Sequence, residues 1–170
     1  MRTVYRRDPS LGLGYGASSL IASVNVWTSG NPEQCQRGAD LLLRNGKLAA
    51  AYDELAHGND MASTELSATP HSSGWLLNGR KEVVTNIQRS DAIVLFGRTS
   101  PGNGSRNHSQ LFVDKSRLPE GRISYLPRYG TVGLRGVQLG GAQFDDCPID
   151  PNGLIGREGQ GLETAMKSFQ

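Results

Sequence analysis

The segment Gly74-Trp-Leu-Leu-Asn-Gly-Arg-Lys-Glu-Val-Val-Thr85 carries the strongest structural signal of this 170-residue chain. The dipeptide Asn78-Gly79 lies inside it, with strand-forming residues on both sides. Because both central residues of a type I′ turn need positive φ, this dipeptide predicts a two-residue β-hairpin. Short apolar runs separated by Gly, Pro, Asn and Ser continue around it, which is typical of an antiparallel β domain.

Glycine supplies 22 of the 170 residues, well above the average of about 7%. This excess favours turns and short strands over long helices. Beside the hairpin, strands are expected at residues 49–53, 65–68, 92–98, 110–114, 123–126 and 137–145.

Helix signals flank this β region. Asp8 can cap a helix that has Pro9 in its first turn, and an apolar face continues as far as Trp27. A second helix has Asn31 as its cap, Gln34 at the capping-box position and Asn45-Gly46 as its terminator. A last helix follows Gly161 and has barely begun at the end of the sequence. The sequence thus predicts an α+β fold: an antiparallel, barrel-like β domain preceded by two helices and followed by a truncated one.

Charge and composition exclude several classes of function. The 18 basic and 16 acidic residues give a net charge of +2 and form no long run, so nucleic-acid binding is not expected. No apolar stretch has the length of a membrane span, and Met1 does not begin a secretory signal. We therefore expect a cytoplasmic protein, in which Cys35 and Cys147 are free thiols.

Three motifs have simpler interpretations than the functions they suggest. Gly12-x-Gly14-x-x-Ala17 matches a dinucleotide fingerprint, but it falls inside a predicted helix, where close helix packing explains small residues. Glu54, His57 and Asp60 share no helix or strand face, so no catalytic or metal role is expected for them. The glycines around Gln160 fit a linker better than a phosphate site.

Six segments occur in a fixed order. They are Asn31-Pro-Glu-Gln34, residues 46–60, residues 77–86, Val132-Gly-Leu-Arg-Gly136, Phe144-Asp-Asp-Cys-Pro148 and Gly156-Arg-Glu-Gly-Gln-Gly161. In order and spacing they resemble the successive signatures of the acyl-CoA dehydrogenase family. The resemblance implies a remnant of that family's N-terminal helical domain at 1–46, its flavin-binding middle β domain at 47–157 and the start of its C-terminal helical domain at 158–170.

The cofactor implied by this resemblance is FAD. A flavin ring presents acceptors at N5 and O4 and a donor at N3, so strand-end backbone groups and a hydroxyl can orient it. The resemblance places one flavin segment at Ala51, Tyr52 and Asp53, continuing to Asn59, which is also the implied substrate contact. It places the second segment at Val83, Val84 and Thr85, where strand alternation puts Val83 and Thr85 on one face.

Several positions depart from the pattern of the family. Asp53 stands where the family has a threonine that donates to the flavin, and an ionised carboxylate can only accept and also opposes an anionic reduced flavin. Asn59 replaces a serine, Val83 replaces a tryptophan, and Val137 and Leu139 replace hydroxyl residues. The sequence therefore indicates a divergent member.

The resemblance also implies a reaction and partners. The family removes an α-proton with a glutamate base and passes the β-hydride to the flavin, and that base belongs to a domain absent from these residues. No catalytic residue is therefore assigned, and negligible dehydrogenation is expected of these 170 residues alone. The implied partners are an acyl-CoA or other acyl-thioester, an electron-accepting flavoprotein and, for a full-length protein, further copies of itself. Two alternatives stay open: a non-catalytic binding or scaffold protein of this fold, and a flavin-dependent oxygenase relative.

Overall fold

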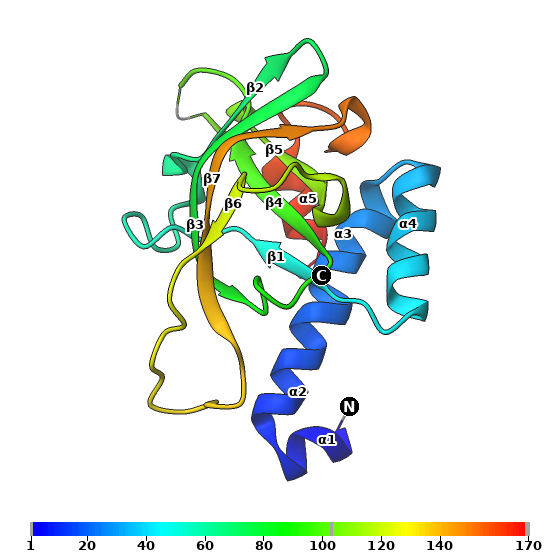
Figure 1. Ribbon diagram of the computed structural model, residues 1–170, viewed down its shortest axis with the longest axis vertical. Coiled ribbons are helices and arrows are strands. Elements are labelled where there is room, and N and C mark those ends of the chain that lie inside the picture. The colour runs from blue at the N-terminus through cyan, green and yellow to red at the C-terminus, as the bar shows by residue number, and fades with distance from the viewer. Residues whose placement is uncertain (1, 103, 169–170) are drawn as a thin grey trace.

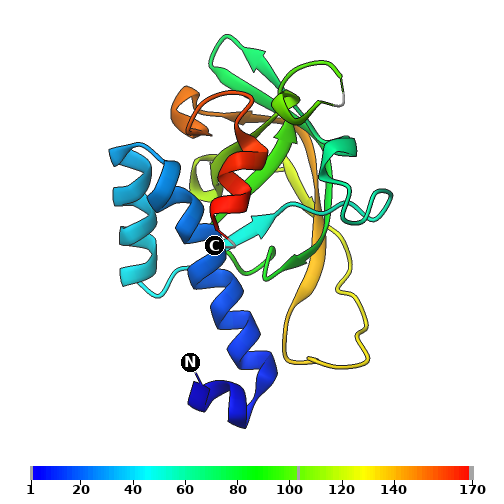
Figure 2. The same ribbon diagram turned by 180° about the vertical axis from the view of Figure 1, so that it is seen from behind.

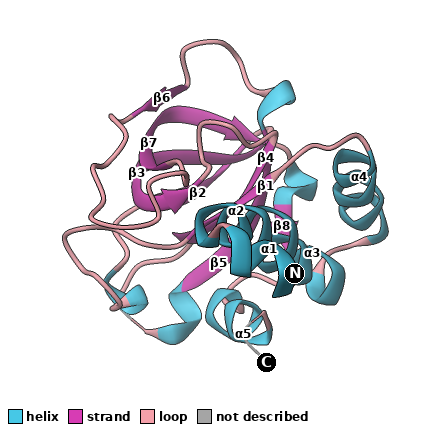
Figure 3. Ribbon diagram, turned by 90° about the horizontal axis from the view of Figure 1, so that it is seen from below, coloured by secondary structure: helices cyan, strands magenta, loops and turns pink. Residues whose placement is uncertain are grey.

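A computed structural model describes residues 2–102 and 104–168; residues 1, 103, 169 and 170 lie outside the description. Helices lie on one side of the molecule and a twisted sheet on the other (Figures 1 and 3). The helices are α1 (Arg2–Arg7), α2 (Pro9–Gly16), the π-helix η1 (Ala17–Ile21), α3 (Ala22–Ser29), α4 (Pro32–Leu43) and α5 (Gly161–Lys167). Short 3₁₀ turns occur at η2 (Met61–Ser63), η3 (Ser105–Asn107), η4 (Lys115–Arg117) and η5 (Pro151–Gly153).

The predicted helix starts are confirmed. The Asp8 carboxylate accepts from the Ser10 amide at 2.8 Å, and α2 begins at Pro9. Asn31 and Gln34 form the reciprocal capping box that opens α4. Gly12 lies inside α2, where an added Cβ would be 2.7 Å from the ring of Tyr5. Close packing against α1 thus accounts for Gly12, as expected from its helical position, whereas Gly14 has no such close contact among the described residues.

The strands form one mixed sheet of eight. They are β1 (Leu48–Ala51), β2 (Ser67–His71), β3 (Gly74–Thr85), β4 (Ala92–Arg98), β5 (His108–Asp114), β6 (Ile123–Tyr125), β7 (Leu139–Ile149) and β8 (Leu154–Ile155). Their order is β6-β7-β3-β2-β4-β5-β8, and β1 pairs with β4 in parallel. The α+β class is confirmed, and the sheet path is open at β6 and β8 rather than closed into a barrel.

The prediction of a hairpin turn at Asn78-Gly79 is wrong. Ser72 and Ser73 connect β2 to β3, and β3 continues through the dipeptide. Asn78 instead exchanges hydrogen bonds with Asp146 of β7, at an irregularity of the β3–β7 ladder. Gly79 has φ of +126°, and a Cβ there would lie 2.8 Å from Leu66 Cα. Positive φ and close backbone approach, rather than chain reversal, therefore explain this glycine.

Two apolar clusters hold the layers together. Strand β4 is buried on both faces from Ala92 to Gly97. One cluster, which contains Leu77, Leu95 and Phe144, lies within the sheet. The other packs β1, β4 and β5 against the helices and includes Val26 of α3. Figure 2 shows α3 and α5 covering this face of the sheet.

A glycine of β7 provides a test of how tightly this sheet is packed. Gly141 faces a bulge in β3, and an added Cβ would lie 2.6 Å from the Lys81 carbonyl oxygen and 2.8 Å from a Leu126 methyl carbon. We expect Gly141→Ala to lower the free energy of unfolding by about 2 kcal/mol, because the backbone must shift. Among the described residues other than its chain neighbours, none has an atom within 4 Å of the Gly130 Cβ position. Gly130→Ala should therefore change the free energy of unfolding by no more than about 0.5 kcal/mol. Urea denaturation measures both, and equal effects would contradict this account.

Candidate functional site

The two segments expected to hold a flavin lie side by side. The Glu82 amide donates to the Asp53 carbonyl oxygen at 2.9 Å. The Lys81 ammonium donates to the Tyr52 carbonyl oxygen at 2.8 Å. The chain that follows β1 therefore meets β3 immediately before Val83, although about thirty residues separate the two in sequence.

The side chains of these segments point in different directions. Ala51 and Val84 are buried in the core, at 0% and 1% exposure, so only their backbone groups are available to a ligand. Val83 is 37% exposed, and Asp53 and Thr85 are half-buried. Asp53, Val83 and Thr85 are therefore the members of the two segments whose side chains a ligand can reach.

Val83 occupies a bulge that alternation alone does not anticipate. Lys81 pairs with Ala142 and Val84 with Gly140, so two residues of β3 oppose one of β7. Val83 has φ of +57°, an unfavourable conformation for a β-branched residue that persists only where its surroundings impose it. Beyond the bulge, the exposed Val83, the buried Val84 and the half-buried Thr85 alternate again.

Asn59 lies apart from this pair of segments. It belongs to an exposed turn after β1, which an isolated bridge between Glu54 and Gly58 closes. Its carbonyl oxygen accepts from the Met61 amide at 3.0 Å. Across the described ranges, no hydrogen bond joins the Asn59 side chain to the Val83 segment. A role for Asn59 toward substrate therefore stays a prediction.

A buried ion pair, which the sequence analysis missed, lies directly behind the site. The Lys81 side chain is 0% exposed, and its ammonium is 2.9 Å from Glu54 Oε1. The Glu54 carboxylate also accepts from the Glu65 amide at 2.8 Å and the Leu66 amide at 3.1 Å. A buried charge needs this degree of pairing and hydrogen bonding to be tolerated.

The pKa shifts of this pair follow from burial and charge. Burial by itself would raise the pKa of Glu54, but the Lys81 ammonium and two backbone amides hold it below its ordinary value. Burial lowers the pKa of Lys81, and the Glu54 carboxylate opposes that shift. Glu54 is therefore ionised, and the pair forms a salt bridge inside the domain.

The pKa of Asp53 shifts in the opposite direction to that of Glu54. Burial raises the pKa of its carboxyl group, and the nearby Lys81 ammonium counters the rise. Within residues 2–102 and 104–168, no hydrogen bond is found for this carboxylate. Asp53 is therefore protonated more readily than an exposed aspartate, and its neutral carboxyl can donate a hydrogen bond.

Tyr52 faces away from the site, toward helix α3. Its hydroxyl oxygen accepts from Asn25 Nδ2 at 2.6 Å and from Gln110 Nε2 at 3.4 Å. Its ring meets Phe96 edge-on, with ring centroids 6.5 Å apart. Burial raises the pKa of Tyr52 to about 12. The Tyr52 side chain thus ties the end of β1 to the helical layer, and only its backbone faces the site.

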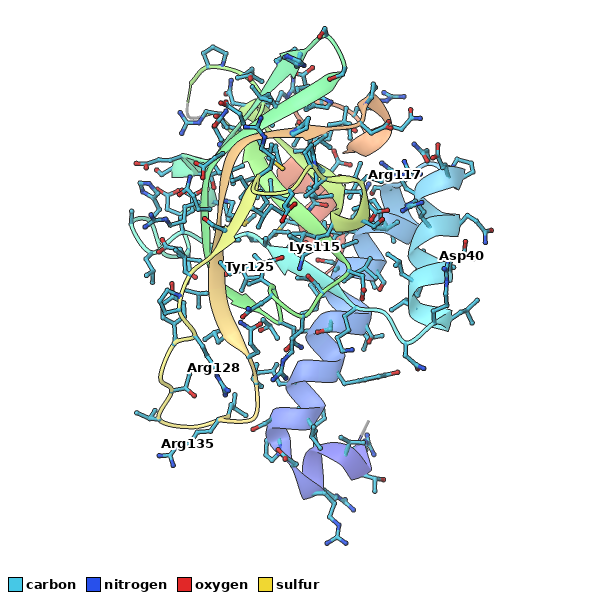
Figure 4. All side chains as sticks on the ribbon, viewed as in Figure 1. Asp40, Lys115, Arg117, Tyr125, Arg128 and Arg135 are labelled. Atoms are coloured by element: carbon cyan, nitrogen blue, oxygen red, sulfur yellow. The ribbon has the colours of Figure 1, made fainter. Side chains whose placement is uncertain are left out.

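The end of β3 is anchored from two sides. Asn86 donates to Ser18 Oγ in the π-helix at 2.6 Å and to the Gly14 carbonyl oxygen at 3.1 Å. Lys115 donates to the Ile87 carbonyl oxygen, and its ammonium lies 5.0 Å from the ring centroid of Tyr125 (Figure 4). These contacts fix the chain directly after Thr85, and π-helical turns occur frequently at functional sites.

An acidic cluster with His57 lies beside Glu54. Ligand atoms of Glu54, His57 and Glu65 lie within 4.8 Å of one another. His57 Nε2 is 3.1 Å from a Glu65 oxygen, and the Lys81 ammonium already neutralises Glu54. Asp60 accepts from the Ser63 hydroxyl at 2.7 Å. Each carboxylate of this cluster therefore has a partner within the chain, and for Glu54 that partner is the Lys81 ammonium.

Comparison with solved structures defines the class of protein. An FAD-dependent dehydrogenase superposes with a TM-score of 0.83 and 27% identity over 94% of this chain and 42% of its own. A chain from the structural study of the electron transferring flavoprotein of Acidaminococcus fermentans gives a TM-score of 0.87 and 25% identity, covering 95% of this chain and 42% of its own. The fold is therefore that of flavoprotein oxidoreductases.

The family follows from the sequence comparisons. Residues 49–147 match the model of the acyl-CoA dehydrogenase middle domain. The mitochondrial isovaleryl-CoA dehydrogenase of Oryza sativa subsp. japonica is 26% identical over 99% of this chain and 41% of its own length. The acryloyl-CoA reductase (NADH) of Anaerotignum propionicum is 28% identical over 88% of this chain and 38% of its length. The chain belongs to the acyl-CoA dehydrogenase family and spans about two fifths of the length of these relatives.

The resemblance stated from sequence is thereby confirmed. Cys35 and Cys147 are both free thiols, as expected. Among the described helices, none combines the length and the apolar character that crossing a membrane requires.

The Tyr52 hydroxyl allows a test of how β1 is held. Tyr52→Phe leaves Asn25 Nδ2 without that acceptor, and we expect a loss of about 1 kcal/mol in the free energy of unfolding at neutral pH. Because the pKa of Tyr52 is about 12 in the folded state and 10.0 ordinarily, folding favours its neutral form. The unmodified protein should therefore lose stability as pH rises from 10 to 12, and Tyr52→Phe should lose less.

The exposed Tyr15, at 62% exposure, is the matched control. Tyr15→Phe should leave both the neutral stability and the alkaline slope unchanged in urea denaturation series at pH 7, 10 and 11. An alkaline slope that survives Tyr52→Phe in full would show that Tyr52 is not its source.

Proposed function

We propose that this chain is the flavin-binding part of an FAD-dependent acyl-CoA dehydrogenase, which oxidises the α,β bond of an acyl-CoA. The observation that carries the proposal is the meeting of two sequence-distant segments at the Glu82–Asp53 hydrogen bond of 2.9 Å. This bond joins Asp53 to the residue directly before Val83, and Thr85 follows two residues later on the same strand.

The groups present there suit the edge of a flavin ring. Thr85 is half-buried, and its hydroxyl makes no hydrogen bond to any part of the chain that the structure describes. A hydroxyl donor with no protein partner can satisfy a flavin acceptor, and Val83 offers exposed apolar surface beside it. We therefore assign the contacts to the side chains of Asp53, Val83 and Thr85, with backbone groups of Ala51, Tyr52 and Val84.

When bound, FAD would supply the acceptor for a hydride; the residues of this chain bind and orient it. The proton-abstracting base is assigned to no residue of this chain, so these 170 residues alone should show negligible dehydrogenation. We assign Asn59 to the acyl-CoA or acyl-thioester substrate. The relatives named as isovaleryl-CoA dehydrogenase and acryloyl-CoA reductase support that substrate class.

The remaining assignments extend the same proposal. We divide the chain into a helical remnant at 1–46, the flavin-binding middle domain at 47–157 and the start of a second helical domain at 158–170. We propose that the full-length protein is a homo-oligomer and that it passes electrons to an electron-accepting flavoprotein. The cytoplasmic location expected from the sequence stays a prediction.

A second candidate is a binding or scaffold protein that kept this fold and lost the flavin. Asp53 favours it, because an ionised carboxylate opposes a reduced flavin. Val83 favours it as well, since it offers less stacking surface than an aromatic residue. Titration of the purified chain with FAD, followed by absorption spectroscopy, separates the two candidates. A saturable flavin band supports the enzyme, whereas an unchanged free-flavin spectrum supports the scaffold.

The Thr85 hydroxyl should contribute directly to flavin affinity. Thr85→Val keeps the shape of the side chain and removes the donor, so we expect FAD to bind about fivefold to tenfold more weakly. Thr69 is exposed on β2, and Thr69→Val should leave the affinity unchanged. Flavin fluorescence titration measures both, and equal affinities for the two variants would remove Thr85 from the site.

Asp53 should make FAD affinity depend on pH. Burial raises the pKa of this carboxyl, so acidification converts it from a charged acceptor to a neutral donor. We expect the affinity of the unmodified chain to rise as pH falls through that pKa. Asp53→Asn and Asp53→Thr should bind roughly fivefold more tightly at neutral pH and show a flat profile. A pH profile identical in all three proteins would contradict the placement of Asp53 at the flavin.

A further inference from the structure

The space between the two proposed flavin segments is not set by a β ladder. Strand β1 pairs only with β4, whereas β3 pairs with β2 and β7, among the described strands. The chain after β1 therefore reaches β3 without regular strand pairing. Some other set of contacts must fix the spacing and register of the two segments.

Two adjacent residues of β3 provide those contacts, on opposite sides of the strand. Toward the interior, the Lys81 ammonium bonds to the Tyr52 carbonyl oxygen and to Glu54, with the Thr64 hydroxyl at 3.5 Å. Toward the surface, the Glu82 carboxylate accepts from the Leu55 amide at 3.1 Å.

The Glu82 amide completes this set of contacts with its bond to the Asp53 carbonyl oxygen. Four successive residues, 52 to 55, are therefore each held by Lys81 or Glu82. We call Glu54, Lys81 and Glu82 the clasp.

We propose that the clasp positions the FAD site, with the buried Lys81–Glu54 ion pair fixing the distance between residues 51–53 and residues 83–85. This inference rests on the proposed function for its flavin role. Lys81 and Glu54 are positioning residues, because their charged groups are buried behind the site and act through the backbone of Tyr52 and Asp53.

The ion pair also explains the strained backbone beside it. Lys81 must point into the core to reach Glu54, while Val83 must point outward two residues later across a bulge. The clasp holds the chain directly before Val83, and Asn86 holds it directly after Thr85. A positive φ at Val83 is imposed between these two fixed points, which is how a strained residue persists at a binding site.

The experiment removes the pair without leaving a buried charge. Lys81→Met alone would strand the Glu54 carboxylate and destabilise the fold. The double variant Lys81→Met/Glu54→Gln removes one positive and one negative charge together. The matched control is Arg37→Met/Asp114→Asn, which removes the ion pair between α4 and the end of β5 and keeps an acceptor for the Ser116 amide.

Two measurements are made on each protein. Hydrogen exchange of the flavin-free protein reports the clasp itself: we expect exchange of the Leu55 and Glu82 amides to accelerate at least tenfold in the clasp double variant. Exchange of the β4 amides of Val94 and Leu95 should stay unchanged. FAD titration should then show at least tenfold weaker binding by this variant and unchanged binding by the control.

Each outcome decides something different. Unchanged exchange at Leu55 and Glu82 overturns the clasp, whatever the flavin result. Accelerated exchange with wild-type FAD affinity overturns its positioning role. Failure of the unmodified chain to bind FAD contradicts the proposed function, and with it the flavin role of the clasp. In that case the exchange rates still show whether the ion pair fixes the two segments.

Discussion

The Lys81 ammonium has no access to water, and the structure around the site follows from that constraint. A buried ammonium must find acceptors, and here they come from the Tyr52 carbonyl oxygen and the Glu54 carboxylate. Glu54 in turn needs donors, which the amides of Glu65 and Leu66 supply. The loop after β1 must therefore fold back between β1 and β2. The contacts of Lys81 and Glu54 thus tie the chain after β1 to β3 and to the residues directly before β2.

Local signals predicted the local parts of the fold. The capping residues Asp8 and Asn31 act as their chemistry requires, and residues 92–98 form β4 as expected from a continuous apolar run. The hairpin predicted at Asn78-Gly79 is absent from the described strands because a glycine with positive φ is found in type I′ turns and also at irregularities inside long strands. Gly79 has the second role. Which of the two applies depends on the close approach of Leu66 to Gly79, and no property of the dipeptide encodes that contact.

For the candidate site too, the sequence predicted the local segments but not the long-range contacts that join them. The order of segments predicted which stretches form a flavin site. Two of them, residues 51–53 and 83–85, lie side by side, whereas Asn59 lies apart. The residues that join them were missed, because a lysine within a strand reads as a solvent-facing side chain. Glu54 drew attention only for its proximity to His57, since nothing in the sequence connects it to Lys81, 27 residues later. Recognition of the ion pair required the fold.

The clasp gives a physical reason why an aspartate is tolerated at position 53. The Lys81 ammonium opposes the rise in the Asp53 pKa that burial causes, so this one cation faces two carboxylates. With Glu54 held ionised by the Lys81 ammonium and two backbone amides, Asp53 is the group that can take up a proton and leave the trio neutral. A neutral Asp53 carboxyl donates a hydrogen bond as a hydroxyl would. In the proposed flavin site, Asp53 thus offers a donor that depends on pH, and the Lys81 ammonium opposes its protonation.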